Sequence, residues 1–119
     1  MSRTKGIDPG RLNHRITIKR YVESEDELGN TINTLEPLKR VWAEVRPLRG
    51  KESLEYYKDV HDQLFKVTIR YTDVTVTDVV VFDGVQYRIQ WITDPLMDHN
   101  YLELMCTRLE EHAVLEEGG

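Results

Sequence analysis

Residues Phe65 to Cys106 constrain the fold most, because they describe most of a small β-sheet almost without interruption. Apolar and polar residues alternate without a slip from Phe65 to Tyr71 and again from Val85 to Trp91. Asp83-Gly84 separates the second run from Val79–Phe82, and Asp-Gly favours a two-residue hairpin turn because both central positions need positive φ. Successive side chains of a strand point to opposite faces. The pattern therefore predicts two apolar stripes around a shared core, formed by Phe65, Val67, Ile69 and Tyr71 and by Val85, Tyr87, Ile89 and Trp91.

Further strands are predicted on both sides of this region. His14–Val22 is the first, with Ile16, Ile18 and Val22 expected on one face. Thr31–Leu35 is β-rich and is either a short returning strand or part of a loop, and the acidic turn before it has Leu28-Gly29-Asn30 as its tip. Lys39–Leu48 is the next strand, with Val41, Ala43 and Val45 on a common face. Tyr101–Thr107 is the last, with Leu102, Leu104 and Cys106 facing inwards and Glu103 and Thr107 facing outwards.

Six or seven short strands at even spacing predict an all-β fold, a small antiparallel β-barrel or a sandwich. The chain of 119 residues suffices for one domain with a modest core. Its apolar content of 39% and charged content of 31% are typical of soluble globular proteins. No apolar run approaches the roughly 20 residues that span a bilayer, and the N-terminus lacks the apolar segment of a secretory signal. We expect synthesis in the cytoplasm.

Three segments fall outside this pattern. Residues 1–12 contain Gly6, Pro9 and Gly10 and are expected to form a flexible arm. Residues 110–119 are an acidic tail, which leaves 13–109 as the barrel domain. Arg49–Gln63 joins two strands and must project from the sheet, either as a long loop or as a short helix with Leu54, Tyr57, His61 and Leu64 on one face. This projecting segment is where the sequence first directs a search for function.

The chain shows little that resembles catalytic or metal chemistry. The four histidines are scattered, and Asp59, His61 and Asp62 are weak evidence for a metal site. Cys106 is the single cysteine, which excludes an internal disulfide, and its place on an apolar strand face predicts an inert core thiol. Glycine-rich phosphate loops and the Gly-x-Ser-x-Gly motif are absent. We therefore expect a protein that is not an enzyme and uses neither a cofactor nor a metal.

Charge and exposed aromatic residues bear on possible partners. A net charge of −5 argues against a general nucleic-acid binder, although a local basic patch remains compatible with it. Trp42 falls on the polar face of its strand with Glu44 and Arg46, where it is either an interface residue or covered by a loop of its own chain. The residues considered for interactions are Trp42, Arg49, Lys51, Leu54, Tyr56, Tyr57, Lys58 and His61.

Four segments, in this order, carry a resemblance to a known family: Leu12–Ile18, Val41–Leu48, Phe82–Ile89 and Tyr101–Cys106. Together they resemble the head–tail joining proteins of tailed bacteriophages, also called head-closure or stopper proteins. The resemblance covers roughly residues 11–108 and rests on structural signatures, not on active-site motifs.

The resemblance implies a small β-barrel that assembles as a ring beneath the portal and adaptor of the virion, closes the packaged head and docks the tail. About twelve copies are expected from a portal-like template. It also implies a long loop that reaches toward the DNA channel, for which Arg49–Gln63 is the matching segment, although its content also suits a helix that contacts a neighbour. Double-stranded DNA would pass the channel without sequence-specific binding, since acidic groups repel phosphates.

Two alternatives stay open at this point. One is a different neck component, such as an adaptor or a tail-completion protein. The other is an oligonucleotide-binding barrel that stacks bases on Tyr56, Tyr57 and Trp42.

Overall fold

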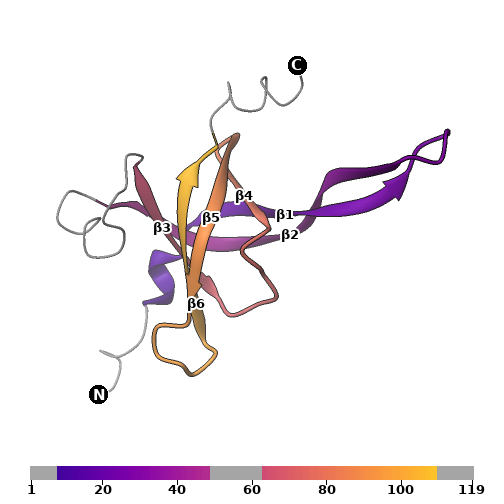
Figure 1. Ribbon diagram of the computed structural model, residues 1–119. Helices are drawn as coiled ribbons and strands as arrows, with labels where there is room; N and C mark the ends of the chain where they lie inside the picture. Colours follow the sequence, from indigo (N-terminus) through magenta and orange to yellow (C-terminus); the bar gives the residue numbers. More distant parts are fainter. Residues whose placement is uncertain (1–7, 49–62, 110–119) are drawn as a thin grey trace.

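The computed structural model describes residues 8–48 and 63–109. Six strands follow a short 3₁₀ turn at Pro9–Arg11 (Figure 1). They are β1 (His14–Glu25), β2 (Thr31–Pro47), β3 (Leu64–Arg70), β4 (Val79–Phe82), β5 (Val85–Thr93) and β6 (Tyr101–Arg108). All neighbours are antiparallel and the sheet closes on itself in the order β1-β2-β3-β6-β5-β4, which confirms the predicted barrel. No helix in the described part of the chain is long and apolar enough to cross a membrane.

The Asp83-Gly84 hairpin forms as predicted. Asp83 and Gly84 have φ of 55° and 78°, and Phe82 pairs with Val85 across the turn. The alternating residues of the surrounding strands meet inside the barrel, where closure leaves a core filled by side chains. The buried core consists of Ile16, Ile18, Ala43, Val67, Ile69, Val80, Tyr87, Ile89, Leu102, Leu104 and Cys106.

Two predicted core positions, Tyr71 and Trp91, lie elsewhere. Tyr71 follows the last residue of β3 and is 49% exposed, with its ring edge-on to His99. Trp91 follows a β-bulge in β5, after which it pairs with Met105 instead of continuing the inward alternation. A bulge adds one residue to a strand and so exchanges the two faces. Ile92, the next residue, therefore packs against the core.

The bulge helps to create a second, smaller apolar cluster. Leu48, Leu64 and Met105 are buried there, and Trp91 packs against them. Thr107, which was expected to face outwards, is only 5% exposed and accepts a hydrogen bond of 2.8 Å from Gln90. Leu48 and Leu64 lie side by side in this cluster, because the Leu48 amide donates to the Leu64 carbonyl at 2.9 Å. The Gln63 side-chain amide donates to the carbonyls of Leu48 and Leu64.

Strands β1 and β2 are longer than expected and form an arm outside the barrel. Thr31–Leu35 is part of one continuous strand with Lys39–Pro47, and β1 runs on to Glu25. Only Thr17–Lys19 of β1 pairs with β4, so no other strand of the described residues lies beside the hairpin beyond Lys19 (Figure 1). Val22 was expected on the core face, but it lies in this hairpin and is 41% exposed. We call residues 20–37 the hairpin arm.

Candidate interaction surface

The predicted interaction residues fall into two groups. Trp42 is described and lies on the outer face of the barrel. The other seven lie outside the described residues: Arg49, Lys51, Leu54, Tyr56, Tyr57, Lys58 and His61. The described part of the surface is therefore built around Trp42.

Trp42 points outwards because its neighbours in β2, Val41 and Ala43, point into the core. Its side chain is 53% exposed, so the described part of the chain does not cover it, contrary to one of the two expectations. Arg15 stands directly opposite on β1, with its guanidinium carbon 4.8 Å from the centre of the indole ring. Such a cation–π contact fixes the orientation of both side chains at the surface.

A hollow of about 450 Å³ lies beside this pair. Its lining consists of Pro9, Leu12, Asn13, Trp42 and Arg70. The 3₁₀ turn supplies one wall, and the Asp8 carboxylate supports that turn by accepting a hydrogen bond of 3.0 Å from the Gly10 amide. Leu12 is 8% exposed, which ties this wall to the barrel. Sequence reasoning missed the hollow, because it brings together residues from the N-terminal region and from β2 and β3.

Positive charge lies near the hollow. Arg15, Arg40 and Arg70 are all exposed, and none of the described carboxylates forms an ion pair with them. The Arg70 guanidinium lies 5.8 Å from the ring centre of Tyr101. Arg11 differs from these three, since it pairs with Glu44 at 2.8 Å. We call Arg15, Arg40, Trp42 and Arg70 with the adjoining hollow the Trp42 surface. Trp, Tyr and Arg are the residues most often found at the energetic centre of interfaces.

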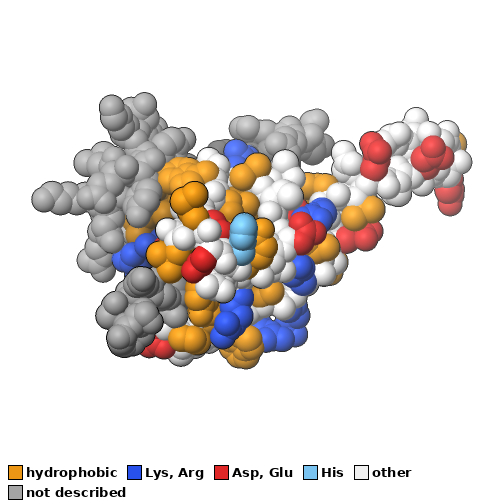
Figure 2. Space-filling model, turned by 90° about the horizontal axis from the view of Figure 1, so that it is seen from below, with side chains coloured by type: hydrophobic (Ala, Val, Ile, Leu, Met, Phe, Trp, Pro, Cys, Tyr) orange, Lys and Arg blue, Asp and Glu red, His pale blue; other side chains and the backbone are white. Residues whose placement is uncertain are grey.

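The hairpin arm carries the opposite charge. Between Tyr21 and Leu38 the sequence has five acidic residues and neither Lys nor Arg: Glu23, Glu25, Asp26, Glu27 and Glu36. Figure 2 shows acidic side chains along the projecting arm and Lys and Arg side chains on the barrel. The acidic run was visible in the sequence. Its position on a hairpin outside the barrel was not visible, because Thr31–Leu35 was predicted to be either a short strand or part of a loop.

The tip of the arm is an ordered turn with an apolar residue at its end. The Asp26 carboxylate accepts hydrogen bonds from the amides of Leu28 and Asn30 at 2.9 and 2.8 Å, and Gly29 has φ of 85°. The bond from the Asn30 amide is the largest influence that lowers the pKa of Asp26. These bonds leave the Leu28 side chain 86% exposed among acidic neighbours.

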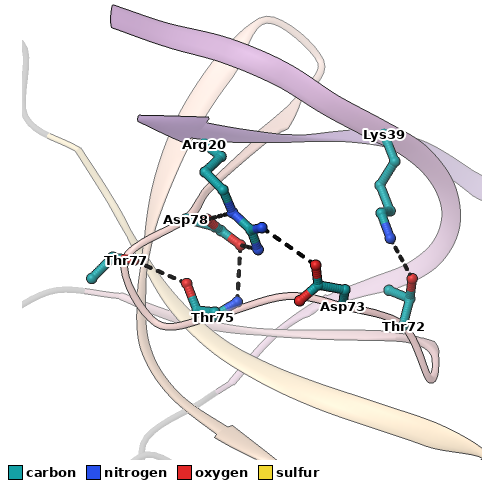
Figure 3. A network of polar contacts seen from close by, with 7 residues as sticks. All are labelled: Arg20, Lys39, Thr72, Asp73, Thr75, Thr77 and Asp78. Carbon is teal, nitrogen blue, oxygen red and sulfur yellow. Dashed lines mark hydrogen bonds and ion pairs between the residues drawn. The ribbon is translucent and has the colours of Figure 1, made fainter. Parts of the chain in front are cut away.

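A polar network holds the base of the arm to the β3–β4 loop (Figure 3). Arg20 of β1 donates to both carboxylate oxygens of Asp78, each at 2.8 Å, and also pairs with Asp73 at 3.3 Å. Asp78 is 2% exposed and also accepts from the Thr75 amide at 2.9 Å. From β2, Lys39 donates to the Thr72 hydroxyl at 2.6 Å. Both strands of the arm are therefore fixed where they leave the barrel.

Two other sets of groups were considered for chemistry, Cys106 and the possible metal ligands. Cys106 is fully buried, and that burial raises the pKa of its thiol to about 12, so the reactive thiolate is scarce at neutral pH. Among residues 8–48 and 63–109, no three His, Cys, Asp or Glu side chains gather as metal ligands would. The Asp59, His61 and Asp62 set lies outside the described residues.

Comparison with known proteins identifies a matching family and similar structures. Residues 7–109 match a family model described as phage head completion protein. A solution structure of protein SF1141 from Shigella flexneri 2a is 26% identical, with a TM-score of 0.75 over 88% of this chain and 99% of that one. A chain of the virion of a native gene transfer agent particle is 17% identical, with a TM-score of 0.58 over 82% and 94%, which shows a shared fold. No curated protein matches the sequence.

Proposed function

The chain belongs to the phage head completion protein family, and we propose that it forms a ring at the head–tail connector of a tailed phage or prophage. In that position it closes the packaged head and docks the tail. Family membership by itself makes the chain a structural protein of the phage head–tail region. The ring, its stoichiometry and its place in the neck are the proposal.

The observation that carries the proposal is the extent of the family match. It covers residues 7–109, which includes the whole barrel, the hairpin arm and the Trp42 surface. The features of this region are those of an assembly part: a closed framework, a projecting arm and an exposed aromatic–arginine surface. Weak contacts suffice for such a part, because ring closure on a portal or adaptor template raises the effective concentration of neighbouring copies.

The proposed partners are the portal or adaptor ring on the head side and tail proteins on the other, with double-stranded DNA passing through the channel. The test is to remove the gene from the phage or prophage and to image the particles with and without the restored protein. We expect filled heads that lose DNA and fail to join tails, and a barrel-shaped ring in the neck of restored particles. Normal necks and infectivity without the protein would overturn the proposal.

The same images distinguish head closure from the two other positions in the neck, those of an adaptor and of a tail-completion protein. A ring that lies between the portal and a further ring of the neck would favour an adaptor, and one at the end of the tail tube would favour a tail-completion protein.

One observation favours a different class of function. Exposed Trp42 beside Arg15 and Arg70 has the composition of a surface that stacks single-stranded bases. Tight single-strand binding that weakens with salt and is lost in Trp42→Ala would support an oligonucleotide-binding barrel. We expect binding to a single-stranded oligonucleotide to be weak and unaffected by that substitution.

A further inference from the structure

The hairpin arm and the Trp42 surface differ in charge and shape in a complementary way. The arm presents five carboxylates with an apolar residue, Leu28, at its tip. The Trp42 surface presents three arginines, of which Arg70 lines the hollow together with Pro9, Leu12 and Trp42. This surface therefore offers an acidic segment with an exposed leucine both arginines for its carboxylates and an apolar site for its leucine.

The two features cannot meet within one molecule. Arg15 and Trp42 lie at the barrel end of the β1–β2 hairpin, and Glu25 and Thr31 lie at its far end. The intervening ten or eleven residues of strand span roughly 35 Å at about 3.3 Å per residue. The network of Arg20, Lys39 and Asp78 holds the base of the arm in this outward direction. The arm and the Trp42 surface can therefore contact each other only between two molecules.

We propose that the hairpin arm of one copy docks on the Trp42 surface of the next copy, with Leu28 entering the hollow and the acidic residues facing Arg15, Arg40 and Arg70. This contact is heterologous, because one copy gives its arm and the other its barrel surface. Repeated with rotation, such contacts close into a ring. The inference rests on the proposed self-association into a ring and specifies the surfaces that make it.

Docking would also cover apolar residues of the arm. A two-stranded hairpin with no third strand is marginally stable in water. Tyr21, Val22 and Ile32 are 53%, 41% and 42% exposed on the two sides of this hairpin. Docking between copies would remove part of this apolar surface from water. Electrostatic attraction between the arginines of the Trp42 surface and the carboxylates of the arm sets the register and weakens with salt.

The first experiment mixes two defective chains. Leu28→Ser with Glu25→Gln and Glu27→Gln removes the tip of the arm, and Trp42→Ala with Arg70→Gln removes the docking surface. Glu25, Glu27 and Leu28 lie on the exposed arm. Trp42 and Arg70 are exposed on the barrel, so both chains are expected to fold. Sedimentation at about millimolar concentration and low salt should show self-association of the wild type at least tenfold stronger than that of either variant.

The mixture gives the decisive result. Each defective chain keeps one intact half of the contact, so the two together should form one-to-one pairs and nothing larger. If the mixture behaves as the sum of its components, or if each variant associates as strongly as the wild type, the proposal is wrong. Binding of either surface to an added oligonucleotide in place of a second copy would also overturn it.

A second experiment traps the contact chemically. Leu28→Cys and Asn13→Cys in one chain should form disulfide-linked multimers under mild oxidation, and the native Cys106 is buried and does not interfere. The control is Leu28→Cys with Arg88→Cys, because Arg88 is exposed on β5, across the closed barrel from β2. Equal trapping in the control, or no trapping of the first pair in the free protein and in particles, would contradict the contact.

Particles carrying Leu28→Cys and Asn13→Cys also separate this inference from the function. A ring in the neck without the cross-link leaves the proposed function in place and removes the arm contact. Cross-linked multimers of the pure protein that never occupy the neck keep the contact and remove the function.

Discussion

Arg20 and Asp78 form a two-fold hydrogen-bonded ion pair, with both nitrogen–oxygen distances at 2.8 Å, across 58 positions of sequence. The pair joins β1, at the base of the hairpin arm, to the residue that precedes β4. The Asp78 carboxylate is buried and Arg20 is partly exposed, so the charge on the arginine compensates for the removal of the carboxylate from water.

Replacing Asp78 by Ala should lower the free energy of unfolding by about 2 kcal/mol, because the substitution removes charge-assisted hydrogen bonds and leaves the Thr75 amide without its acceptor. Urea unfolding of the full chain measures the loss. Asp73→Ala is the matched control, since Asp73 is largely exposed and makes one longer contact with Arg20 at 3.3 Å. Its effect should be less than half as large, and equal losses would contradict the importance assigned to Asp78.

The contribution of Asp78 should disappear in acid. Burial is the largest single influence and would raise the pKa of this carboxyl, but the hydrogen bonds from Arg20 and Thr75 and the charge of Arg20 together outweigh it and hold the pKa below its ordinary value. A carboxyl with a lowered folded-state pKa stabilises the fold at pH values above its unfolded pKa of about 3.9, and this stability is lost as the pH falls through the folded value. The difference in unfolding free energy between wild type and Asp78→Asn should be constant from neutral pH to about 5 and shrink below 4. A difference that grows in acid would show the opposite linkage.

Gly84→Ala should destabilise the β4–β5 hairpin through its backbone alone. Gly84 has φ of 78°, and a Cβ there would meet no atom within 4 Å. The left-handed conformation costs a residue with a Cβ roughly 1–2 kcal/mol. Gly84→Asn should lose less, because asparagine tolerates this region of φ. Thermal unfolding of both variants provides the measurement, and equal losses would point to a cause other than backbone conformation.

Substitutions of a buried and of an exposed leucine should distinguish effects on folding from effects on assembly. Leu104 is fully buried in the barrel core, so Leu104→Ala should lower the unfolding free energy by about 3 kcal/mol. Leu28 is 86% exposed, so Leu28→Ala should change it by no more than about 0.5 kcal/mol. Association between copies should respond in the reverse order once both chains are folded. A large loss of stability in Leu28→Ala would show that the arm tip packs within its own chain.

Trp42 offers a spectroscopic report on the Trp42 surface. It is 53% exposed, whereas Trp91 packs against the buried Leu48, Leu64 and Met105. Acrylamide should quench the tryptophan fluorescence of the wild type strongly and that of Trp42→Phe only weakly. Assembly should reduce quenching in the wild type, because the indole becomes covered, and should leave the Trp42→Phe chain unchanged. Unaltered quenching on assembly would exclude Trp42 from the contact.

The barrel was predictable because its strands obey simple alternation. The Asp83-Gly84 turn, the inward residues of β3 and β6 and the burial of Cys106 all follow from local pattern. Tyr71 and Trp91 were placed wrongly for different reasons: the first lies beyond its strand, and the second follows a bulge that no residue in the sequence marks. Bulges arise from the geometry of barrel closure and not from local propensity.

The candidate surface was predictable only in part. Trp42 was singled out because it broke the polar pattern of its strand, and the acidic run near Glu25 was evident. The hollow and the basic rim required tertiary structure, since Asn13, Trp42 and Arg70 come from three separate parts of the chain. The extent of the hairpin arm also depended on it, because a β-rich segment after a turn reads equally well as a loop.

The pairing of β1 with β2 continues well beyond the last residues that β4 holds. The length of the hairpin arm is consequently independent of the packing of the barrel core. Adding or deleting matched residue pairs near the tip would lengthen or shorten the hairpin by about 3.3 Å per pair while the barrel stays intact. Under the proposed arm contact, the spacing between successive copies would change with the length of this hairpin while the barrel interior stays the same.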